Sequence, residues 1–368
     1  MSSTWKNALS LSIFGESHGA AIGMTLDGLP AGLAVDVEVL QTFLNRRAPG
    51  NFPWSTPRKE TDIPKFLSGI YQGHTTGSPI TAIIENTNTK SKDYMALADV
   101  PRPGHADFAA HMKYGGYEDK RGGGHFSGRL TAAMCIAGGI CLQILERRGI
   151  TIGANIQTVG GSAVDYSLNE NFVDAKKLKE LTKQDLPVLL AENREHIIAE
   201  IEQAKAEGDS IGGLIGCAAV GVPAGLGDPM FFGMENRIAS LIYAIPAVKG
   251  LQFGSGLGVS MMRGSETNGS IEAENGKVTL KDNYDGGIQG GITNGMKLLL
   301  TVAIKPTPSI GKTQKSVNLK TGEQVNLNIE GRHDPCIVPR AVPVIEAAVA
   351  IAIYDAILET EGKQYATR

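Results

Sequence analysis

The pattern of hydrophobic and polar positions along the chain predicts strands and helices in mixed order. Short apolar runs that end at glycine, proline or polar residues predict strands over 8–14, 22–33, 66–71, 80–85 and 150–159. Apolar residues at helical spacing predict helices over 36–47, 128–149 and 341–362. The charge-rich segment 173–208 also has a helical pattern. Because Pro187 divides it, we expect two solvated helices there, without a catalytic role.

An internal repeat is indicated by two similar glycine-rich segments. Residues 215–226 (IGCAAVGVPAGL) match residues 22–33 (IGMTLDGLPAGL) at Ile-Gly, at the next glycine and at Pro-Ala-Gly-Leu. Two weaker matches follow in the same order, 68–70 with 249–251 and 123–131 with 286–294. The shared order predicts one domain, 1–368, built from two related halves that superpose. The halves would span roughly 1–165 and 209–362, with a charged helical insertion at roughly 170–208.

Composition limits the classes of partner. The chain has 368 residues, of which 42% are hydrophobic and 20% charged, so it is expected to be globular. Its formal net charge of −3 gives no electrostatic surface for nucleic acid or for an anionic membrane. A polyanionic small substrate remains possible if basic residues cluster locally.

The cysteines and the apolar segments indicate the compartment. None of the four cysteines forms a C-x-x-C pair, which favours buried, reduced thiols. The N-terminal region does not resemble a signal peptide, and the most apolar segment, 132–142, is too short to span a bilayer. The run 341–358 carries Glu346 and Asp355. We therefore expect a soluble, cytoplasmic protein.

The stretch 102–131 carries the densest candidate chemistry. Arg102 and His105 lie in a Pro/Gly turn, and the glycines of 122–124 let the backbone approach a ligand closely. Ser127 is placed to cap the helix that follows. A glycine-rich loop that opens a helix can bind phosphate through free N–H groups and the helix dipole. The alternative is a mobile surface loop ahead of an ordinary core helix.

Two further positions allow a functional and a structural interpretation. His18 follows the first strand and could act as a general acid or donate to a phosphate, or it could be an ordinary turn histidine. Arg46 and Arg47 end a predicted helix. They could bind carboxylate or phosphate in bidentate fashion, or simply complement the helix dipole.

Two loops in the second half offer similar alternatives. Residues 305–309 (KPTPS) place a lysine before two hydroxyls in a proline-restricted loop, which suits a phosphate group or is a plain strand-ending turn. Arg332, His333 and Asp334 are consecutive ionisable residues ahead of a helix. They indicate either a site or a solvated turn.

Taken together, these segments resemble the chorismate synthase family. The resemblance runs in family order over nearly the whole chain and is carried by 15–19, 44–49, 68–77, 102–107, 113–129, 247–250, 286–295, 305–309 and 332–343. It implies a lyase of the shikimate pathway, which converts 5-enolpyruvylshikimate 3-phosphate to chorismate and phosphate by 1,4-anti elimination. The family requires reduced FMN. The implied structure is an α+β fold, a β-α-β sandwich with pseudo-symmetric halves, assembled as a homotetramer.

The resemblance also implies roles for particular residues. His18 would assist the leaving phosphate, His105 would protonate or stabilise the reduced flavin, and Asp334 would relay a proton. The implied substrate-binding residues are Arg46, Arg47, Arg102, Ser127, Arg129 and Arg332. The implied flavin-binding residues are His125, Phe126, Ser127, Pro246, Ala247, Gly290, Lys305, Pro306, Thr307, Pro308, Ser309 and Arg332. NADPH is a candidate reductant of the flavin, with Arg47 as its candidate contact, and no metal is implied.

The chain departs from the commoner family pattern at two places. Residues 125–130 read HFSGRL where many members have Arg-Ser-Ser-Ala-Arg-Glu, and Pro53 replaces an arginine that the family links to the nicotinamide dinucleotide. The first change makes a catalytically inactive FMN- or phosphate-binding relative the main alternative. The second weakens the inference of intrinsic reduction by NADPH. A flavin oxidoreductase ranks lower, because no G-x-G-x-x-G fingerprint follows a clear strand.

Overall fold

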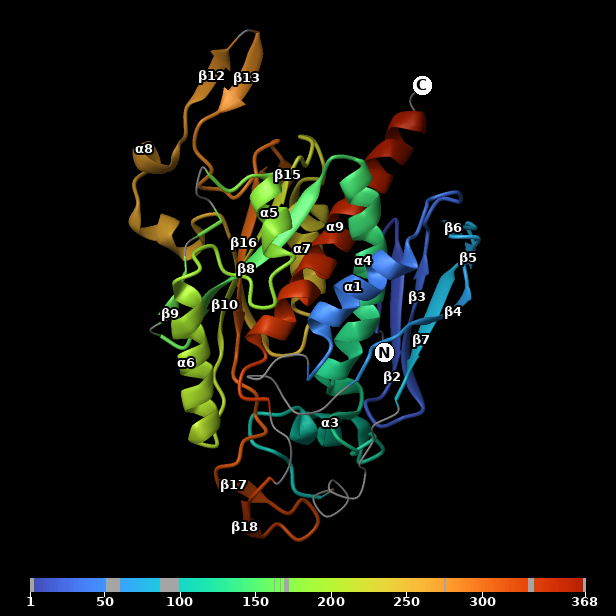
Figure 1. Ribbon diagram of the computed structural model, residues 1–368, viewed down its shortest axis with the longest axis vertical. Coiled ribbons are helices and arrows are strands. Elements are labelled where there is room, and N and C mark those ends of the chain that lie inside the picture. Colours follow the sequence, from blue (N-terminus) through green and yellow to red (C-terminus); the bar gives the residue numbers. More distant parts are fainter. Residues whose placement is uncertain are drawn as a thin grey trace.

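Two antiparallel sheets enclose a central layer of helices (Figure 1). The computed structural model describes residues 3–50, 60–86, 99–161, 163–165, 167–168, 172–274, 276–329 and 334–366. The first sheet has the order β1 (Thr4–Lys6), β2 (Ser10–Gly15), β3 (Ala21–Asp27), β7 (Ile80–Glu85), β4 (Lys65–Ser68). The second has the order β11 (Val248–Phe253), β16 (Leu298–Ile304), β10 (Gly213–Val220), β8 (Thr151–Val159), β9 (Ala163–Val164). This is the predicted β-α-β sandwich.

The two halves share one topology. The order β2-β3-β7-β4 in the first sheet is repeated as β8-β10-β16-β11 in the second, and each of these neighbouring pairs is antiparallel. Helix α1 (Val37–Arg47) follows β3, and α7 (Met234–Ile242) follows β10. Helices α4 (Thr131–Arg147) and α9 (Val338–Ala366) follow β7 and β16. The predicted pseudo-symmetric halves are therefore confirmed.

The three sequence matches differ in how well the structure supports them. Ile22 pairs with Ile84, and Ile215 pairs with Val302, so the match of 22–33 with 215–226 holds residue for residue. The match of 68–70 with 249–251 joins the right strands in the wrong register. If Ile22 and Ile215 are equivalent, their partners Ile84 and Val302 are equivalent, and so are Ala82 and Leu300 two residues earlier. Ala82 pairs with Phe66 and Leu300 pairs with Phe253, so Phe66 is the residue equivalent to Phe253.

The third match is wrong. Segment 286–294 forms the hairpin β14 (Ile288–Gln289) and β15 (Ile292–Thr293), whereas 123–131 leads into α4. Its counterpart by topology is the hairpin β5 (Ile70–Tyr71) and β6 (His74–Thr75), which lies between β4 and β7. Short glycine motifs misled the alignment because glycine with positive φ recurs in both types of turn.

The central layer is formed largely by α4 and α9, which pack closely against each other. A Cβ on Gly138 would lie 2.2 Å from the Ala347 Cβ, so α4 needs glycine there. Two helices, spanning 128–147 and 338–363, are long and apolar enough to cross a membrane by length and composition. Most of each lies buried inside the protein, as core helices do. Segment 132–142 is thus only the apolar centre of a longer helix.

Of the inserted helices α5 (Ala175–Leu181) and α6 (Asn193–Ala206), α5 packs on the face of the second sheet away from the central core, whereas Ile197 and Ile201 of α6 join that core. Because side chains alternate along a strand, Cys217 joins the central core while Ala218 packs with Leu178 of α5. In the first sheet Phe14 is 40% exposed and Leu67 is 55% exposed. Among the described residues, no helix covers that outer face.

Several short elements were not predicted from the sequence. They are α3 (Asp107–Tyr114), α8 (Gly264–Thr267), β12 (Ile271–Glu274), β13 (Lys277–Leu280), β17 (Gln314–Val317) and β18 (Gln324–Leu327). Pro53 and Pro57 predict a loop over 51–62, and the polar, irregular sequence of 90–103 predicts another; both segments lie largely outside the described residues. The four cysteines are buried and free of disulfides, as expected, and burial raises the pKa of Cys135 and of Cys336 to about 12.

Candidate active site

His18 and the glycine loop lie against each other. The Ser17 amide donates to the Gly124 carbonyl (3.0 Å), and the Ser17 hydroxyl accepts from the Gly123 amide (3.2 Å) and contacts His18 Nδ1 (3.0 Å). A Cβ on Gly122 would lie 2.3 Å from the His18 ring, and Gly122 has a φ of +63°. The glycines therefore let the loop approach a buried histidine, and not only a ligand as the sequence analysis supposed.

Ser127 begins the helical segment as predicted. Its hydroxyl accepts from the Arg129 amide (3.2 Å), which caps the turn η2 (Gly128–Leu130) ahead of α4. His125 is anchored through both ring nitrogens, since Nδ1 donates to the Gly15 carbonyl (2.8 Å) and Nε2 contacts the Ser3 hydroxyl (2.6 Å). The Phe126 ring lies beside the turn. His125 therefore ties the first strand to this loop.

A cluster of three arginines lines a cavity of about 230 Å³ beside Ser127. Arg47 is its most enclosed member. Its guanidinium bonds Asp62 Oδ2 (2.6 Å), the Gly128 carbonyl (2.8 Å) and the Thr131 hydroxyl (3.1 Å). All three contacts are buried or nearly so. Arg47 thus joins the end of α1 to the beginning of α4.

Two further arginines complete the cluster. Arg129 lies in the turn that precedes α4, and Arg340 lies near the start of α9 (Val338–Ala366). Arg129 contacts Asp62 Oδ1 and lies 2.9 Å from Glu60 Oε2. Arg340 bonds Asp334 Oδ2 at 2.8 Å. Each of the three arginines in this cluster therefore has a carboxylate partner within the protein.

The pKa shifts follow from this arrangement. Burial alone would raise the pKa of Asp62, but the Arg47 and Arg129 charges outweigh it and lower that pKa. Burial and the nearby Arg47 charge lower the pKa of Arg340. The cluster is thus a compact set of buried charges whose guanidinium groups partly repel each other.

A second network joins the Arg102 turn to the Lys305–Ser309 loop. Arg102 binds Asp107 through Nε (2.7 Å) and the Gly122 carbonyl through NH2 (2.6 Å). Its NH1 reaches the Ser309 hydroxyl at 3.4 Å. Lys305 Nζ donates to the Gly104 carbonyl (2.5 Å). The structure therefore brings together two loops that lie two hundred residues apart, both of which the resemblance places at the site.

The loop 305–309 is also fixed from two other sides. The Lys305 amide donates to the Ala247 carbonyl (2.9 Å), and Ala247 has a positive φ of 74° after Pro246. The Thr307 hydroxyl donates to the Asp334 carbonyl (3.0 Å). Asp334 Oδ1 is buried and has no hydrogen-bond partner among the described residues. The residues of the second half that the resemblance implies for flavin binding thus form one cluster. The exceptions are Gly290 and Arg332, the latter outside the described residues.

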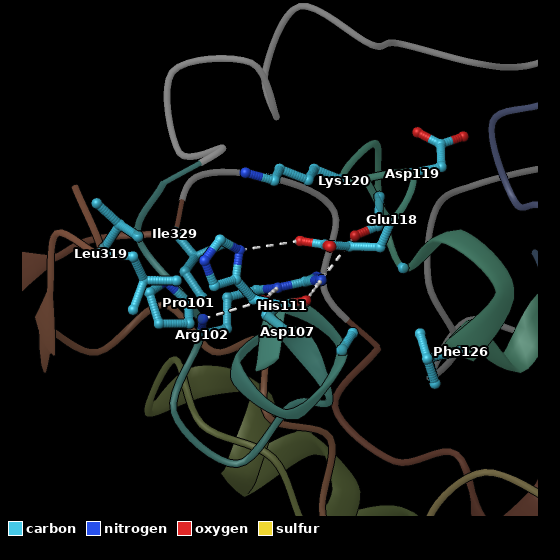
Figure 2. A pocket seen from close by; sticks show the side chains of 14 residues that line it. Pro101, Arg102, Asp107, His111, Glu118, Asp119, Lys120, Phe126, Leu319 and Ile329 are labelled. Atoms are coloured by element: carbon cyan, nitrogen blue, oxygen red, sulfur yellow. Dashed lines mark hydrogen bonds and ion pairs between the residues drawn. The ribbon is translucent and has the colours of Figure 1, made fainter. Parts of the chain in front are cut away.

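A smaller cavity lies behind the Arg102 turn (Figure 2). Its lining includes Arg102 of the turn, Asp107 and His111 of α3, and Glu118. His111 Nδ1 lies 3.4 Å from Glu118 Oε1. The cavity separates α3 from the glycine loop and extends to Phe126.

Two described residues that the resemblance implies, Arg46 and Gly290, are not brought to these clusters. Arg46 forms a bidentate pair with Glu346 (2.5 and 3.0 Å) between α1 and α9. Gly290 lies in the hairpin beside the Leu298 end of β16, whereas Lys305 follows its Ile304 end. Arg332 lies outside the described residues, as do His333 and Pro53.

Sequence reasoning missed several members of the site. Glu60 and Asp62 were assigned to a loop, and Arg340 and Asp107 stood inside quoted segments without a role. A usable signal exists for Arg340, which shares the segment 332–343 with Asp334 where the longest apolar helix begins. No local signal marks Asp62, because its partners are distant in sequence.

The chain is similar to known proteins over nearly its whole length. The family described as chorismate synthase matches residues 9–358. The chain is 47% identical to the chorismate synthase of Lancefieldella parvula over 99% of this chain and 98% of the relative. It is 45% identical to that of Thermococcus kodakarensis over 95% and 96%. A crystal structure of chorismate synthase matches with a TM-score of 0.74 at 29% identity, covering 96% of this chain and 92% of the other.

The fold and site define a two-sheet enzyme whose buried cations converge on a small-molecule cavity. The chain belongs to the chorismate synthase family. Membership makes it a carbon–oxygen lyase acting on a phosphate in the shikimate pathway.

Proposed function

We propose that this chain converts 5-enolpyruvylshikimate 3-phosphate to chorismate and phosphate by 1,4-anti elimination, with reduced FMN as cofactor. The observation that carries the proposal is the convergence of Arg47, Arg129 and Arg340 on the cavity beside Ser127. The substrate carries two carboxylates and a phosphate. Guanidinium groups bind both in bidentate fashion, and burial strengthens such contacts. A chain of net charge −3 would have to concentrate cations in this way.

The carboxylates in the cluster are compatible with an anionic substrate. Glu60, Asp62 and Asp334 hold the arginines in place in the ligand-free protein. An incoming carboxylate or phosphate would use the remaining N–H groups or replace one of these partners. The lowered pKa of Arg340 reflects repulsion from Arg47 as well as burial, and a bound anion would relieve that repulsion.

The residues around loop 305–309 fit FMN. Lys305 and the hydroxyls of Thr307 and Ser309 form a donor set suited to a phosphate group. Asp334 Oδ1 lies beside this loop and has no hydrogen-bond partner in the part of the chain that the structure describes, so it suits a protic group of the ring. Lys305–Ser309, Pro246, Ala247, His125, Phe126 and Ser127 would hold the cofactor. When bound, reduced FMN would supply an electron transiently, without net redox change.

The acid–base residues would act around the two bonds that break. The C3–O bond breaks with its electron pair leaving on phosphate, and C6 loses a proton as the ring gains a double bond. His18, held by Ser17 against the glycine loop, would protonate the leaving phosphate. His105 would hold a proton near the reduced cofactor, and Asp334 Oδ1 would accept one. Burial at these positions excludes water and strengthens each interaction.

We also propose that the enzyme is a cytoplasmic homotetramer. The uncovered outer face of the first sheet, with Phe14 and Leu67 exposed, is a surface that a second copy would cover. Gly290 lies at the far end of β16 from Lys305, about 20 Å along a seven-residue strand. It would therefore contact a cofactor only in a neighbouring copy. Light scattering of the purified protein, giving four times 38.9 kDa, would support this, and a monomer would contradict it.

The source of electrons is a separate question. Arg47, the candidate contact for NADPH, is 3% exposed. Its guanidinium is hydrogen-bonded to Asp62, to the Gly128 carbonyl and to Thr131. A dinucleotide would reach it only if Asp62 moved. Reduction by a separate donor is therefore favoured over intrinsic reduction by NADPH.

The decisive experiment is an anaerobic assay of the purified chain with the enolpyruvyl substrate and dithionite-reduced FMN. Chorismate formation that is absent with oxidised FMN would support the proposal. Tight binding of reduced FMN without product would instead favour the inactive relative, with residues 125–130 as the cause. Replacing dithionite by NADPH then tests the reductant, and activity with NADPH alone would contradict reduction by a separate donor.

A further inference from the structure

Asp107, two residues after His105, has two contacts at each of its carboxylate oxygens. Asp107 Oδ2 accepts from the Arg102 amide (3.0 Å) and Nε (2.7 Å). Asp107 Oδ1 accepts from Arg102 NH2 (2.8 Å) and contacts His105 Nδ1 (2.5 Å). These four contacts use all the acceptor sites of a carboxylate. Figure 2 shows Asp107 and Arg102 side by side at the cavity wall.

Counting protons settles which nitrogen of His105 is protonated. Arg102 NH2 carries two hydrogens, and these go to Asp107 Oδ1 and to the Gly122 carbonyl (2.6 Å). It therefore has none left for His105 Nδ1, which lies 3.1 Å away. Burial would raise the pKa of Asp107, but hydrogen bonds and charge from Arg102 and His105 hold it well below its usual range. An ionised carboxylate can only accept, so His105 Nδ1 must donate to it.

We propose that Asp107 is a positioning residue for His105: its carboxylate fixes the proton on Nδ1 and leaves Nε2 as the nitrogen that exchanges protons in the reaction. The inference rests on the proposed acid–base role of His105. It goes further by assigning the tautomer and the group that sets it. Arg102 then acts mainly as the clamp that orients Asp107, because three of its contacts are to that one carboxylate.

A structural explanation must be separated from this one. Asp107 is the first residue of α3, and an acidic residue there also stabilises the helix dipole. The chain offers a matched control in Asp119, which accepts from the Arg121 amide (3.0 Å) and guanidinium (2.9 and 2.8 Å). Among the described residues, no histidine donates a hydrogen bond to Asp119. The two carboxylates thus form similar arginine clamps, in which Asp107 meets an imidazole and Asp119 instead shares a hydrogen bond with Glu16.

The kinetic test is a double-variant cycle of His105→Ala and Asp107→Asn in the anaerobic chorismate assay. Asparagine keeps the shape of Asp107 but presents an N–H to Nδ1, which forces the proton to Nε2. We expect each single variant to lose about a hundredfold in kcat. The double variant should be within about threefold of His105→Ala alone, because residues that act as a unit are not additive. Multiplied losses, or Asp107→Asn within about threefold of wild type, would overturn the proposal.

A second readout does not depend on activity. Nitrogen-15 spectra of histidine-labelled protein report the protonated ring nitrogen, and only seven histidines contribute. The signal missing from His105→Ala identifies His105. We expect Nδ1–H in wild type and in Asp119→Asn, and Nε2–H in Asp107→Asn. An Nε2–H tautomer in wild type would refute the inference, whereas absent chorismate formation with Nδ1–H intact would count only against the proposed function.

Discussion

Thr75 and Thr293 make the same four hydrogen bonds in the two halves of the molecule. The Thr75 hydroxyl donates to the Pro30 carbonyl (2.7 Å) and accepts from the Leu33 amide (2.9 Å). The Thr293 hydroxyl does the same with the Pro223 carbonyl and the Leu226 amide, at the same distances.

The backbone of each threonine repeats the pattern. Thr75 N donates to the Leu33 carbonyl, and Thr293 N to the Leu226 carbonyl, both at 2.9 Å. Their carbonyls accept from Gly32 and Gly225, both at 2.8 Å. The repeated Pro-Ala-Gly-Leu turn is thus conserved between the halves because a buried threonine of each hairpin satisfies its backbone.

Replacing either threonine by valine should destabilise the protein to a similar degree. Valine keeps the shape but leaves a buried or part-buried amide and a part-buried carbonyl without their hydroxyl partner, which costs about 1–3 kcal/mol. Urea unfolding at fixed protein concentration measures this. Thr81→Val is the control, because its hydroxyl meets Thr25 on the partly exposed outer face (3.1 Å) and should cost less than about 1 kcal/mol. Equal midpoints for Thr75→Val and wild type would contradict the assignment.

Local patterns explain which elements could be predicted. Strands such as β3 and β10 follow from apolar runs ended by glycine, and α4 and α9 from long apolar periodicity. Helix α3 is not predictable from local signals, because its N-cap residue is Ala106, which provides no side-chain cap, directly after a Pro/Gly turn. The hairpin β12–β13 was missed because Ile271 and Val278 are exposed, so no buried face marks it.

The site was predictable as a set of segments but not as a set of contacts. The resemblance placed the Arg102 turn and the Lys305 loop together, and the structure joins them through Gly104 and Ser309. Ion-pair partners are set by tertiary packing, and no local rule gives them. Arg46 and Glu346 are three hundred positions apart, so a pair that satisfies Arg46 inside the core could not be anticipated.

Arg46 provides a test of this distinction. Its partner Glu346 is 1% exposed and also accepts from the Ala154 amide (3.1 Å). Arg46→Met should therefore lower stability by about 3–5 kcal/mol, because a buried charge is left unpaired. The KM for the enolpyruvyl substrate should stay within about twofold of wild type. Arg148→Met, which breaks an exposed Arg–Glu pair, should cost less than about 1 kcal/mol. A large rise in KM with unchanged stability would restore Arg46 to the substrate site.

Asp62 makes stability depend on pH in a defined direction. Its pKa in the folded protein is lowered by Arg47 and Arg129 against the opposing effect of burial. The stabilisation is therefore complete above the unfolded pKa of about 3.9 and is lost as pH falls through the lower folded value. Asp62→Asn should be less stable than wild type at pH 7, and the difference should shrink below pH about 4. Urea midpoints at several pH values test this, and a difference that grows on acidification would contradict it.

Gly122 links the loop geometry to His18 in a way that a single methyl group can test. In Gly122→Ala the new Cβ would lie 2.3 Å from His18 Nδ1 and Cε1 and 2.9 Å from the Ser17 hydroxyl, at a φ of +63°. The His18 ring must move, so we expect kcat to fall at least about tenfold, the scale of a misplaced acid–base group. The positive φ itself should cost about 1–2 kcal/mol of stability.

The clash and the backbone strain can be separated by a second substitution. In the His18→Ala background the ring is gone, so Gly122→Ala should keep only the φ strain and the 2.9 Å contact with the Ser17 hydroxyl, and it should cost less stability than in wild type. Gly258→Ala is the matched control, since a Cβ there meets nothing within 4 Å and its φ is not positive. Chorismate formation and urea midpoints together give the answer. If the Gly122→Ala penalty were the same with and without the His18 ring, the loop would not be held against His18 as the structure shows.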